Sequence, residues 1–262
     1  MTMQDRVAAV IVAAGSSRRM EGHDKLWIPL AGRITLARTI DVFEASTVID
    51  AIVLVLSKER IAEAERLCRQ EGWRKIAGIV PGGMRRQDSV RAGLDTLARM
   101  MEGPPYTGRD QSDLPSKEGE PQGVPQCDWV MIHDGARPLV SPAILEAGLR
   151  AAQEYGAAIA GMPVKDTIKQ VRQGIVHTTF DRSQLWAVQT PQVFSFQLIY
   201  AAHHAPEAEQ DVTDDAALLE RLGQPVAIFP GAYTNIKITT VEDLTIAEAL
   251  LRRRDAMDGE MQ

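Results

Sequence analysis

Cationic side chains follow a stretch of small residues near the amino end of the chain. Residues 14–17 (AGSS) come directly after the apolar run Val7–Ala13, and Arg18, Arg19 and Lys25 follow them. Small residues let a backbone approach a ligand closely, and cations beyond the carboxyl end of a buried strand can hold a polyphosphate. The spacing is neither that of a P-loop nor that of the dinucleotide fingerprint. We therefore predict a phosphate-binding loop of a third kind; the alternative is a strand that runs into a basic surface loop.

A second set of residues suited to chemistry is GGMRRQDS at positions 82–89, which precedes a helical pattern. Paired glycines permit close backbone approach, and the start of a helix offers free N–H groups. Arg86 and Ser89 could hold a base, a ribose or a phosphate. The alternative is an ordinary turn before a capped helix.

The sequence IHDGARP at positions 132–138 directly follows a buried apolar run. Asp134 is therefore expected at the carboxyl end of a strand, where α/β proteins bind ligands. A carboxylate there can hold Mg²⁺ beside phosphates, and Arg137 can make a forked contact with a phosphate. The alternative is an Asp–Arg ion pair that closes a loop. His133 is expected to pack at the end of the strand, and the histidines do not have the spacing of a zinc site.

Further polar residues in the second half of the chain have no chemical spacing of their own. They are Asp166-Thr167, Asp181-Arg182, QTPQ at 189–192, Thr213-Asp214-Asp215 and NIKIT at 235–239. Asp215 is expected to cap a helix and compensate its dipole. Residues 235–239 are expected to form a late strand, on which Lys237 taken alone would be a solvated charge.

Length and composition exclude several classes of protein. A chain of 262 residues that is 45% hydrophobic and 24% charged has the profile of a soluble globular protein. Its net charge of −6 argues against a nucleic-acid coat. Cys68 and Cys127 form neither a disulfide framework nor a metal-binding spacing, which favours a reducing cytoplasm. We expect neither a signal peptide nor a membrane-spanning segment.

Short apolar runs alternate with helical patterns along most of the chain. The expected strands are Val7–Ala13, Ala51–Leu56, Ile76–Val80, Trp129–His133, Ala157–Pro163 and Val226–Phe229. The expected helices are Thr35–Ala45, Lys58–Glu71, Gln87–Met101, Pro142–Tyr155, Phe196–Ala202, Asp214–Leu222 and Val241–Arg254. This alternation predicts a single α/β domain, with a mostly parallel sheet between two layers of helices.

Two segments interrupt the alternation. Residues 102–126 are rich in Pro, Gly, Ser and charge, which predicts a mobile surface insertion. In residues 164–186, apolar stretches flank Arg172-Gln173-Gly174, a pattern typical of a β-hairpin. Such a hairpin must lie off the main sheet as an arm, and it is too thin to bury its own apolar side chains. A second copy of the chain could cover them through a twofold contact.

Seven motifs, taken in this order, resemble one family: the 2-C-methyl-D-erythritol 4-phosphate cytidylyltransferases of the non-mevalonate isoprenoid pathway. They are AAGSSRRM with Lys25, GGMRRQDSV, HDGARP, PVKDTIK, FDRSQLWAVQTPQ, VTDDA and NIKITTVEDL. Each motif is weak alone, but their order and their spread over nearly the whole chain are specific.

The resemblance implies a Rossmann-like three-layer α/β fold with a protruding β-arm, and a homodimer formed through that arm. It implies transfer of CMP from CTP to 2-C-methyl-D-erythritol 4-phosphate with release of pyrophosphate, assisted by Mg²⁺ or another divalent cation. By resemblance, the residues that carry the reaction are Arg19, Lys25, Arg182 and Lys237. Those expected around CTP are Ala14, Gly15, Gly83, Arg86, Ser89, Asp134 and Gly135, with Asp134 also a metal ligand. Those expected to hold the methylerythritol phosphate are Arg137, Thr167, Arg182, Thr190, Thr213 and Lys237.

The sequence departs from the family around Lys25, where Asp24-Lys25-Leu26 replaces the usual Pro-Lys-Gln in a slightly shorter loop. That spacing also resembles the molybdenum-cofactor nucleotidyltransferases. Two alternatives remain: a cytidylyltransferase for another polyol phosphate, such as ribitol 5-phosphate, and a non-catalytic nucleotide-binding module. Loss of Arg19, Lys25 or Lys237 would mark the second alternative, and all three are present.

Overall fold

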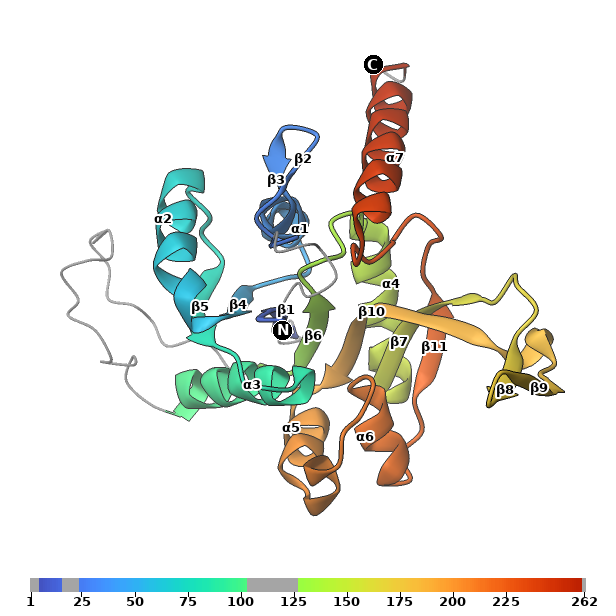
Figure 1. Ribbon diagram of the computed structural model, residues 1–262. Helices are drawn as coiled ribbons and strands as arrows, with labels where there is room; N and C mark the ends of the chain where they lie inside the picture. The colour runs from blue at the N-terminus through green and yellow to red at the C-terminus, as the bar shows by residue number, and fades with distance from the viewer. Residues whose placement is uncertain (1–4, 16–23, 103–126, 261–262) are drawn as a thin grey trace.

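A seven-stranded sheet forms the centre of the computed structural model, which describes residues 5–15, 24–102 and 127–260 (Figure 1). The strands lie in the order β11-β7-β10-β6-β1-β4-β5. Their bounds are β1 Val7–Ala13, β4 Ala51–Leu56, β5 Ile76–Pro81, β6 Trp129–Asp134, β7 Ala157–Pro163, β10 Trp186–Ser195 and β11 Ala227–Pro230. Neighbouring strands are parallel except at β10, which runs antiparallel to β6 and β7. The sheet is therefore mostly parallel, as the sequence predicted.

Helices cover both faces of this sheet. One face carries α1 (Thr35–Ala45), α2 (Ile61–Glu71) and α4 (Pro142–Tyr155), and the other carries α3 (Arg86–Glu102), α5 (Phe196–His204) and α6 (Ala216–Arg221). Alternate residues of β1 fill the two resulting cores: Val7, Ala9 and Ile11 join the first, and Ala8 and Val10 join the second. Side chains alternate between the two faces of a strand. A strand that is apolar at every position therefore suits the middle of a three-layer sandwich.

Strand β10 is not among the strands predicted from the sequence, in which residues 189–192 stand out only as polar residues. The QTPQ sequence has two glutamines and a proline, which are poor indicators of a central strand. In the structure, the pairing of β10 with β7 shifts register between Val188 and Gln192, so Pro191 lies at an irregularity where no regular ladder bond is needed. Gln192 is fully buried and pairs with Ile132 of β6. An antiparallel strand thus closes the gap between β6 and β7.

The strand predicted over residues 235–239 is also wrong, because this segment is irregular. Its apolar residues serve a different contact. Ile238 is buried with Leu30, Leu139 and Leu251 in a small separate core. The alternation of polar and apolar residues therefore comes from an irregular segment whose two isoleucines pack into this core, and not from a sheet.

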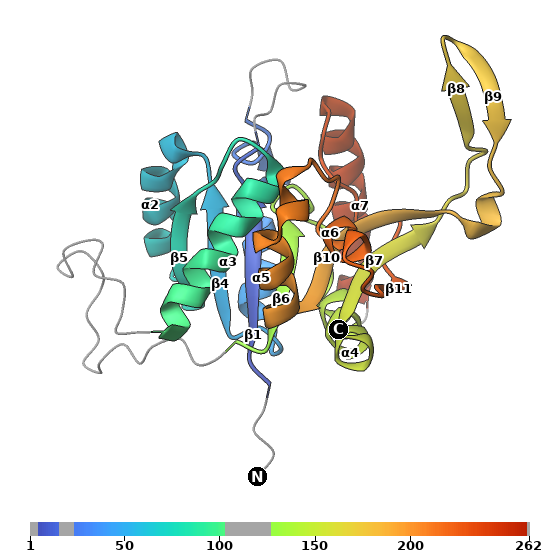
Figure 2. The same ribbon diagram turned by 90° about the horizontal axis from the view of Figure 1, so that it is seen from below.

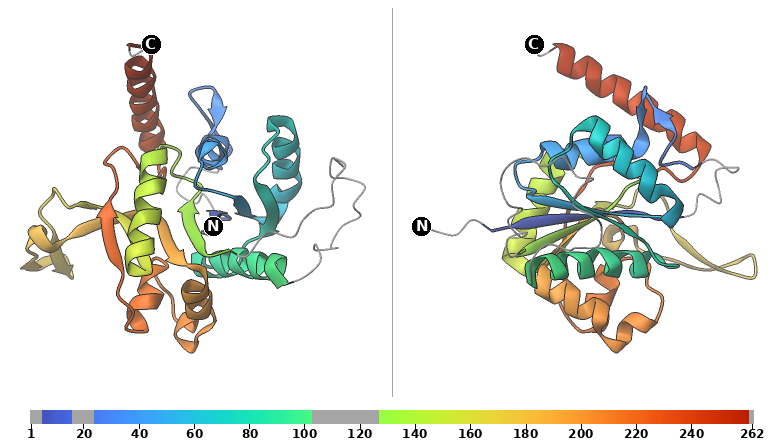
Figure 3. Two further views of the ribbon diagram at one scale, coloured as in Figure 1. Left: turned by 180° about the vertical axis from the view of Figure 1, so that it is seen from behind. Right: turned by 90° about the vertical axis from the view of Figure 1, so that its left-hand side faces the viewer.

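The small core lies beneath the last helix, α7 (Val241–Glu260), which packs against the short hairpin of β2 (Pro29–Leu30) and β3 (Arg33–Ile34). Figure 3 shows α7 on the same side of the sheet as α1 and α2. Within the part of the chain that the structure describes, no helix is long and apolar enough to cross a bilayer. Beyond Glu102, the predicted insertion lies outside the described residues.

Residues 164–186, the arm, leave the body where β7 ends and return where β10 begins (Figure 2). Among the described strands, β8 (Lys169–Arg172) and β9 (Ile175–Thr179) pair only with each other, in a two-stranded antiparallel sheet. The turn between them has positive φ at Gln173 (51°) and Gly174 (80°). Two consecutive positive φ values match the twist of a tight hairpin turn.

Candidate active site

Asp134, the last residue of β6, is surrounded by three cationic side chains. Its Oδ1 accepts from Nε of Arg86 at 3.2 Å, and its Oδ2 lies 2.8 Å from Nζ of Lys237 and 3.6 Å from Nε of Arg137. Burial alone would raise the pKa of this carboxyl, but Arg86, Lys237 and Arg137 outweigh burial and hold the pKa well below its usual range. Asp134 is therefore ionised. We call these four residues the Asp134 cluster.

The three cations come from segments that are far apart in the sequence. Arg86 begins α3 after β5, Arg137 lies in the turn after β6, and Lys237 follows β11. These strands all point the same way, so the segments that follow them meet at one edge of the sheet. Nη1 of Arg137 also donates to the carbonyl oxygen of Asn235 at 2.8 Å, which ties the second segment to the third.

The glycine pair before α3 is required by packing against protein atoms. A Cβ at Gly82 would lie 2.3 Å from the Cβ of Ala14, and a Cβ at Gly83 would lie 2.4 Å from the Cβ of Asp88. The hydroxyl of Ser89 accepts from the N–H of Gly83 at 3.2 Å and is 3.2 Å from the carbonyl oxygen of Arg85, to which it donates. Ser89, predicted to contact CTP, therefore shapes the loop that presents Arg86, and its contact with a nucleotide stays a prediction.

Thr190, predicted to hold the second substrate, lies behind Asp134. Its hydroxyl oxygen accepts from the backbone N–H of Asp134 at 3.0 Å and lies 3.0 Å from Nδ1 of His133. His133 is fully buried, as expected for a packed residue at the strand end, and its Nε2 lies 3.2 Å from the carbonyl oxygen of Arg137. Burial lowers the pKa of His133 to about 4, so the ring is neutral at pH 7. Thr190 and His133 therefore position Asp134 and the turn that carries Arg137.

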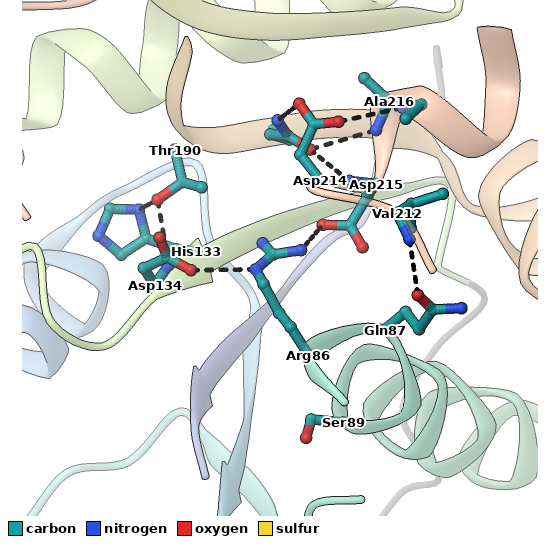
Figure 4. Close-up of polar contacts among 12 residues, drawn as sticks. Arg86, Gln87, Ser89, His133, Asp134, Thr190, Val212, Asp214, Asp215 and Ala216 are labelled. Atoms are coloured by element: carbon teal, nitrogen blue, oxygen red, sulfur yellow. Dashed lines mark hydrogen bonds and ion pairs between the residues drawn. The ribbon is translucent and has the colours of Figure 1, made fainter. Parts of the chain in front are cut away.

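Asp215 lies at the N-cap position of α6, as predicted, but its side chain makes no capping hydrogen bond. That bond comes from Asp214, whose Oδ1 accepts from the N–H of Ala217 at 3.2 Å. Asp215 is fully buried, and its Oδ2 lies 2.7 Å from Nη1 of Arg86 (Figure 4). Its Oδ1 lies 3.2 Å from Nε2 of His203. The motif TDDA offers two adjacent carboxylates, and sequence alone does not indicate which one turns inward. With Asp215 counted, the three cations face two carboxylates, and a net positive charge remains for an anionic ligand.

Nη2 of Arg86 is buried and has no hydrogen-bond partner among the described residues. A buried donor without a partner costs about 1–3 kcal/mol, and such groups in native proteins call for an explanation. A bound anion beside the cluster would supply the missing acceptor. This orphaned donor and the net positive charge both point to a phosphate-bearing ligand.

Lys25 lies in a turn over residues 24–27, in which the N–H of Trp27 donates to the carbonyl oxygen of Asp24 at 2.9 Å. Nε of Arg60, in the short helix η1 (Lys58–Arg60), donates to the carboxylate of Asp24 at 3.1 Å. Asp24, at which the sequence departs from the family, is thus paired with Arg60, and this pair holds the turn. Arg19 lies outside the described residues, and Gly15 is exposed; among the described residues, no atom lies within 4 Å of a Cβ placed there.

Three predicted substrate residues, on the arm and in the loop before α6, make no hydrogen bond or ion pair with the Asp134 cluster in the described part of the chain. They are Thr167, Arg182 and Thr213, and all three are exposed. Nη1 of Arg182, in the short helix η3 (Arg182–Gln184), donates to the carbonyl oxygen of Lys165 at 2.7 Å, within the base of the arm. Gly135, in contrast, is next to Asp134, and a Cβ there would lie 3.1 Å from side-chain atoms of Ala13 and Leu36.

Within the described part of the chain, Asp134 is the carboxylate of this site that is suited to a metal. Among the described residues, no group of three or more His, Cys, Asp or Glu side chains is placed to hold an ion. Mg²⁺, however, is commonly held by one or two carboxylates together with substrate phosphates. The ionised carboxylate of Asp134 fits such a role when a polyphosphate supplies the other ligands.

Comparison with known proteins gives one consistent family. The sequence model named IspD, 2-C-methyl-D-erythritol 4-phosphate cytidylyltransferase, matches residues 7–102 and 122–253. A protein of that name from Dehalococcoides mccartyi (strain CBDB1) is 44% identical over 254 residues, which are 97% of this chain and 99% of that protein. One from Geobacillus kaustophilus is 42% identical over 250 residues, which are 95% of this chain and 98% of that protein.

Solved structures agree with the sequence relatives. The crystal structure of 4-diphosphocytidyl-2C-methyl-D-erythritol synthase from Anaerococcus prevotii superposes with a TM-score of 0.74 at 30% identity, covering 95% of this chain and 99% of that one. The 2-C-methyl-D-erythritol 4-phosphate cytidylyltransferase of Thermus thermophilus gives a TM-score of 0.66 at 27% identity, over 93% and 98% of the two chains. The predicted family, fold class and enzyme class are confirmed. The chain belongs to the 2-C-methyl-D-erythritol 4-phosphate cytidylyltransferase family, and it is a nucleotidyltransferase.

Proposed function

We propose that this protein transfers the cytidylyl group of CTP to 2-C-methyl-D-erythritol 4-phosphate. A phosphate oxygen of the polyol phosphate attacks the α-phosphorus of CTP. The bond between that phosphorus and the oxygen that bridges the α- and β-phosphates breaks, and pyrophosphate leaves. The products are 4-diphosphocytidyl-2-C-methyl-D-erythritol and pyrophosphate. The observation that carries the proposal is the Asp134 cluster, a net positive site at the carboxyl edge of the sheet in a chain of this family.

Fixed cations are the main requirement of such a reaction, because negative charge develops on the leaving pyrophosphate. Arg19 and Lys25, after β1, are proposed to stabilise that charge. Arg86 and the backbone near Gly83 and Gly135 are proposed to hold CTP. No covalent intermediate is needed, since both reacting groups are phosphates brought into line by the protein.

Lys237 and Arg137 are proposed to hold the phosphate of the second substrate. An ammonium group has three N–H donors, and Asp134 engages Nζ of Lys237 from one side at 2.8 Å. The remaining donors are left for an anion, while Asp134 keeps the ammonium in place. Asp134 therefore orients Lys237, and it would also hold a divalent ion bound to the triphosphate.

A bound Mg²⁺ would supply charge neutralisation across the phosphates of CTP. Activity is therefore expected to disappear in excess chelator and to return on titration with Mg²⁺. Full activity in excess chelator would refute the metal role. Cys68 and Cys127 are free thiols, which suits a reducing compartment, and we propose a cytoplasmic enzyme.

We propose that each active site is completed by residues from the arm of a second subunit. Apolar side chains along the arm are exposed, among them Val171 at 54%, Ile175 at 73% and Phe180 at 45%. A two-stranded hairpin cannot bury them by itself, whereas a twofold contact would cover the same patch on both copies. Thr167 and Arg182, at the base of the arm, would then reach the partner's substrate. We therefore propose a homodimer.

The experiment for the reaction is pyrophosphate release with CTP and a panel of polyol phosphates. We expect turnover with 2-C-methyl-D-erythritol 4-phosphate to exceed that with ribitol 5-phosphate by at least about a hundredfold in kcat/KM, since an unmatched polyol leaves buried polar groups unpaired. Faster turnover of ribitol 5-phosphate would replace the proposed acceptor. Absence of pyrophosphate with every acceptor would indicate a non-catalytic nucleotide-binding module.

A further inference from the structure

A chain of buried charges extends from the Asp134 cluster into the layer of helices behind it. Asp134 bonds to Nε of Arg86 at 3.2 Å, Nη1 of Arg86 bonds to Asp215 at 2.7 Å, and Asp215 lies 3.2 Å from Nε2 of His203. Asp215 and His203 are 0% and 1% exposed. They come from the start of α6 and the end of α5, and neither is among the residues assigned to the reaction above.

The backbone of Asp215 is itself held from the sheet. Oε1 of Gln192, a buried residue of β10, accepts from the N–H of Asp215 at 3.0 Å and from that of Ala216 at 3.3 Å. Nε2 of the same amide donates to the carboxylate of Asp214 at 2.8 Å. The position of the Asp215 carboxylate is therefore determined by the central sheet rather than by a mobile loop.

Two directional contacts define the orientation of a planar guanidinium group. In Arg86 these are Nε to Asp134 and Nη1 to Asp215, as Figure 4 shows. The third nitrogen, Nη2, is buried and lacks a partner among the residues that the structure describes. Removal of either carboxylate would let the guanidinium group of Arg86 rotate about the bonds at the end of its side chain. Nη2 would then no longer point in a fixed direction.

We propose that Asp215, supported by His203, is a positioning residue that orients Arg86 so that Nη2 can donate to the nucleotide. This inference rests on the proposed binding of CTP by Arg86. The competing explanation is that Asp215 and Arg86 form an ion pair that only stabilises the fold. The two explanations differ in one respect: whether the change in the Kd of CTP on substitution of Asp215 depends on the presence of Arg86.

The test is a double-mutant cycle on Asp215→Asn and Arg86→Ala, read as the Kd of CTP by calorimetry and as kcat and KM. In the otherwise wild-type protein, Asp215→Asn should raise Kd and the KM of CTP by about tenfold or more, with a smaller change in kcat, as expected when a ground-state contact is weakened. In the Arg86→Ala background the same change should alter Kd by less than about twofold, because coupled residues are not additive. An equal factor in both backgrounds would overturn the proposal.

The matched control is Asp211→Asn, which makes the same chemical change a few residues earlier. Asp211 is exposed, and it pairs with Arg85 at 3.1 Å rather than with Arg86. We expect the Kd of CTP to stay within about twofold in this variant, as for most surface ion pairs. A tenfold rise would show that affinity follows the general charge of the segment, which contradicts a specific role for Asp215.

Asp215→Asn leaves a buried cation short of a partner and can prevent folding. His203→Gln is the second variant, since it leaves the Arg86–Asp215 pair intact and changes only the far side of Asp215. We expect a rise of about threefold or more in the Kd of CTP that disappears with Arg86→Ala; a Kd unchanged in a folded His203→Gln protein would remove His203 from the proposal. If the wild type binds CTP but releases no pyrophosphate with any acceptor, the proposed reaction fails while the cycle on Kd still decides this inference.

Discussion

The Asp134 cluster and the arm differ in how far the contacts of their side chains are satisfied within one chain. Asp134 is only 7% exposed, and its charged neighbours are themselves held by other protein groups, such as Asp215 on Arg86 and the carbonyl of Asn235 on Arg137. The arm is a separate two-stranded sheet, and its apolar residue Ile175 is 73% exposed. The first region is preorganised within a single subunit.

This difference separates the contributions to the site that one chain makes alone from those that need a second subunit. A packed, charged cluster at a sheet edge acts by fixed electrostatics, so its residues should matter for turnover without help from a partner. An exposed hairpin acts only through what covers it. The predictions below test this division, from the largest expected effect to the smallest.

Lys237→Ala should have the largest effect, lowering kcat/KM by about a hundredfold to a thousandfold, because it removes a preorganised charge from the Asp134 cluster. The fold should persist, since the Lys237 side chain is 38% exposed and packs little. Steady-state kinetics and thermal unfolding are the measurements. The control is Lys58→Ala, on the exposed η1 helix, which should leave kcat/KM unchanged. Near-normal turnover of Lys237→Ala would mean that the cluster does not contribute to the reaction.

Mixed dimers should separate the two regions. Arg182→Ala removes a residue at the base of the arm and Lys25→Ala removes one from the body, and each variant alone should be nearly inactive. If sites are completed in trans, a mixed dimer has one site with both changes and one with neither, so it should recover up to about half of wild-type activity. The comparison is each variant mixed only with itself. Proven subunit exchange without recovery would place Arg182 in its own subunit's site.

The pH dependence of stability should distinguish a buried from an exposed histidine. The folded pKa of His133 is depressed to about 4 by burial, below the value of about 6.5 in an unfolded chain. The unfolded state therefore binds the proton first as pH falls, and stability is lost from about pH 6.5 down to pH 4. Between pH 7.5 and 5, His133 should account for a loss of about 2 kcal/mol in the free energy of unfolding.

Urea unfolding of His133→Asn at both pH values is the measurement, and the variant should lose that part of the pH dependence. The matched control is His177→Gln on the exposed strand β9, which should keep the wild-type pH dependence. Identical pH dependence in His133→Asn and wild type would contradict the burial argument.

The smallest effect is expected from residues 103–126, which lie outside the described residues. Their composition is too poor in apolar residues to offset the entropy of ordering, and residues 103–121 lie outside the match to the family. Replacement by a short Gly/Ser linker between Glu102 and Cys127 should leave kcat/KM within about threefold, because the entropic cost of joining two chain ends changes slowly with linker length. A collapse of activity with CTP would assign this segment a role in the site.

Sequence patterns alone determined most of the core elements, because their signals are local. The bounds predicted for Val7–Ala13, Ala51–Leu56 and Ala157–Pro163 are those of the structure, as are those of the helices Thr35–Ala45 and Pro142–Tyr155. An uninterrupted apolar run and a 3.6-residue period can each be recognised within a short window of the sequence. The ordered motifs likewise identified the family and the carboxylate at the end of β6.

Only the tertiary structure decided the features that depend on distant partners. The polar residues of β10 gave no strand signal, and they form one because β6 and β7 lie on both sides of it. Residues 235–239 alternate like a strand, yet they are irregular, and Ile236 and Ile238 pack into the small core beneath α7. Asp214 and Asp215 are chemically identical neighbours, and their roles differ because one faces its own helix while the other meets Arg86 and His203. Which carboxylate is buried depends on groups on other elements, including Arg86, 129 residues away, and no local pattern carries that information.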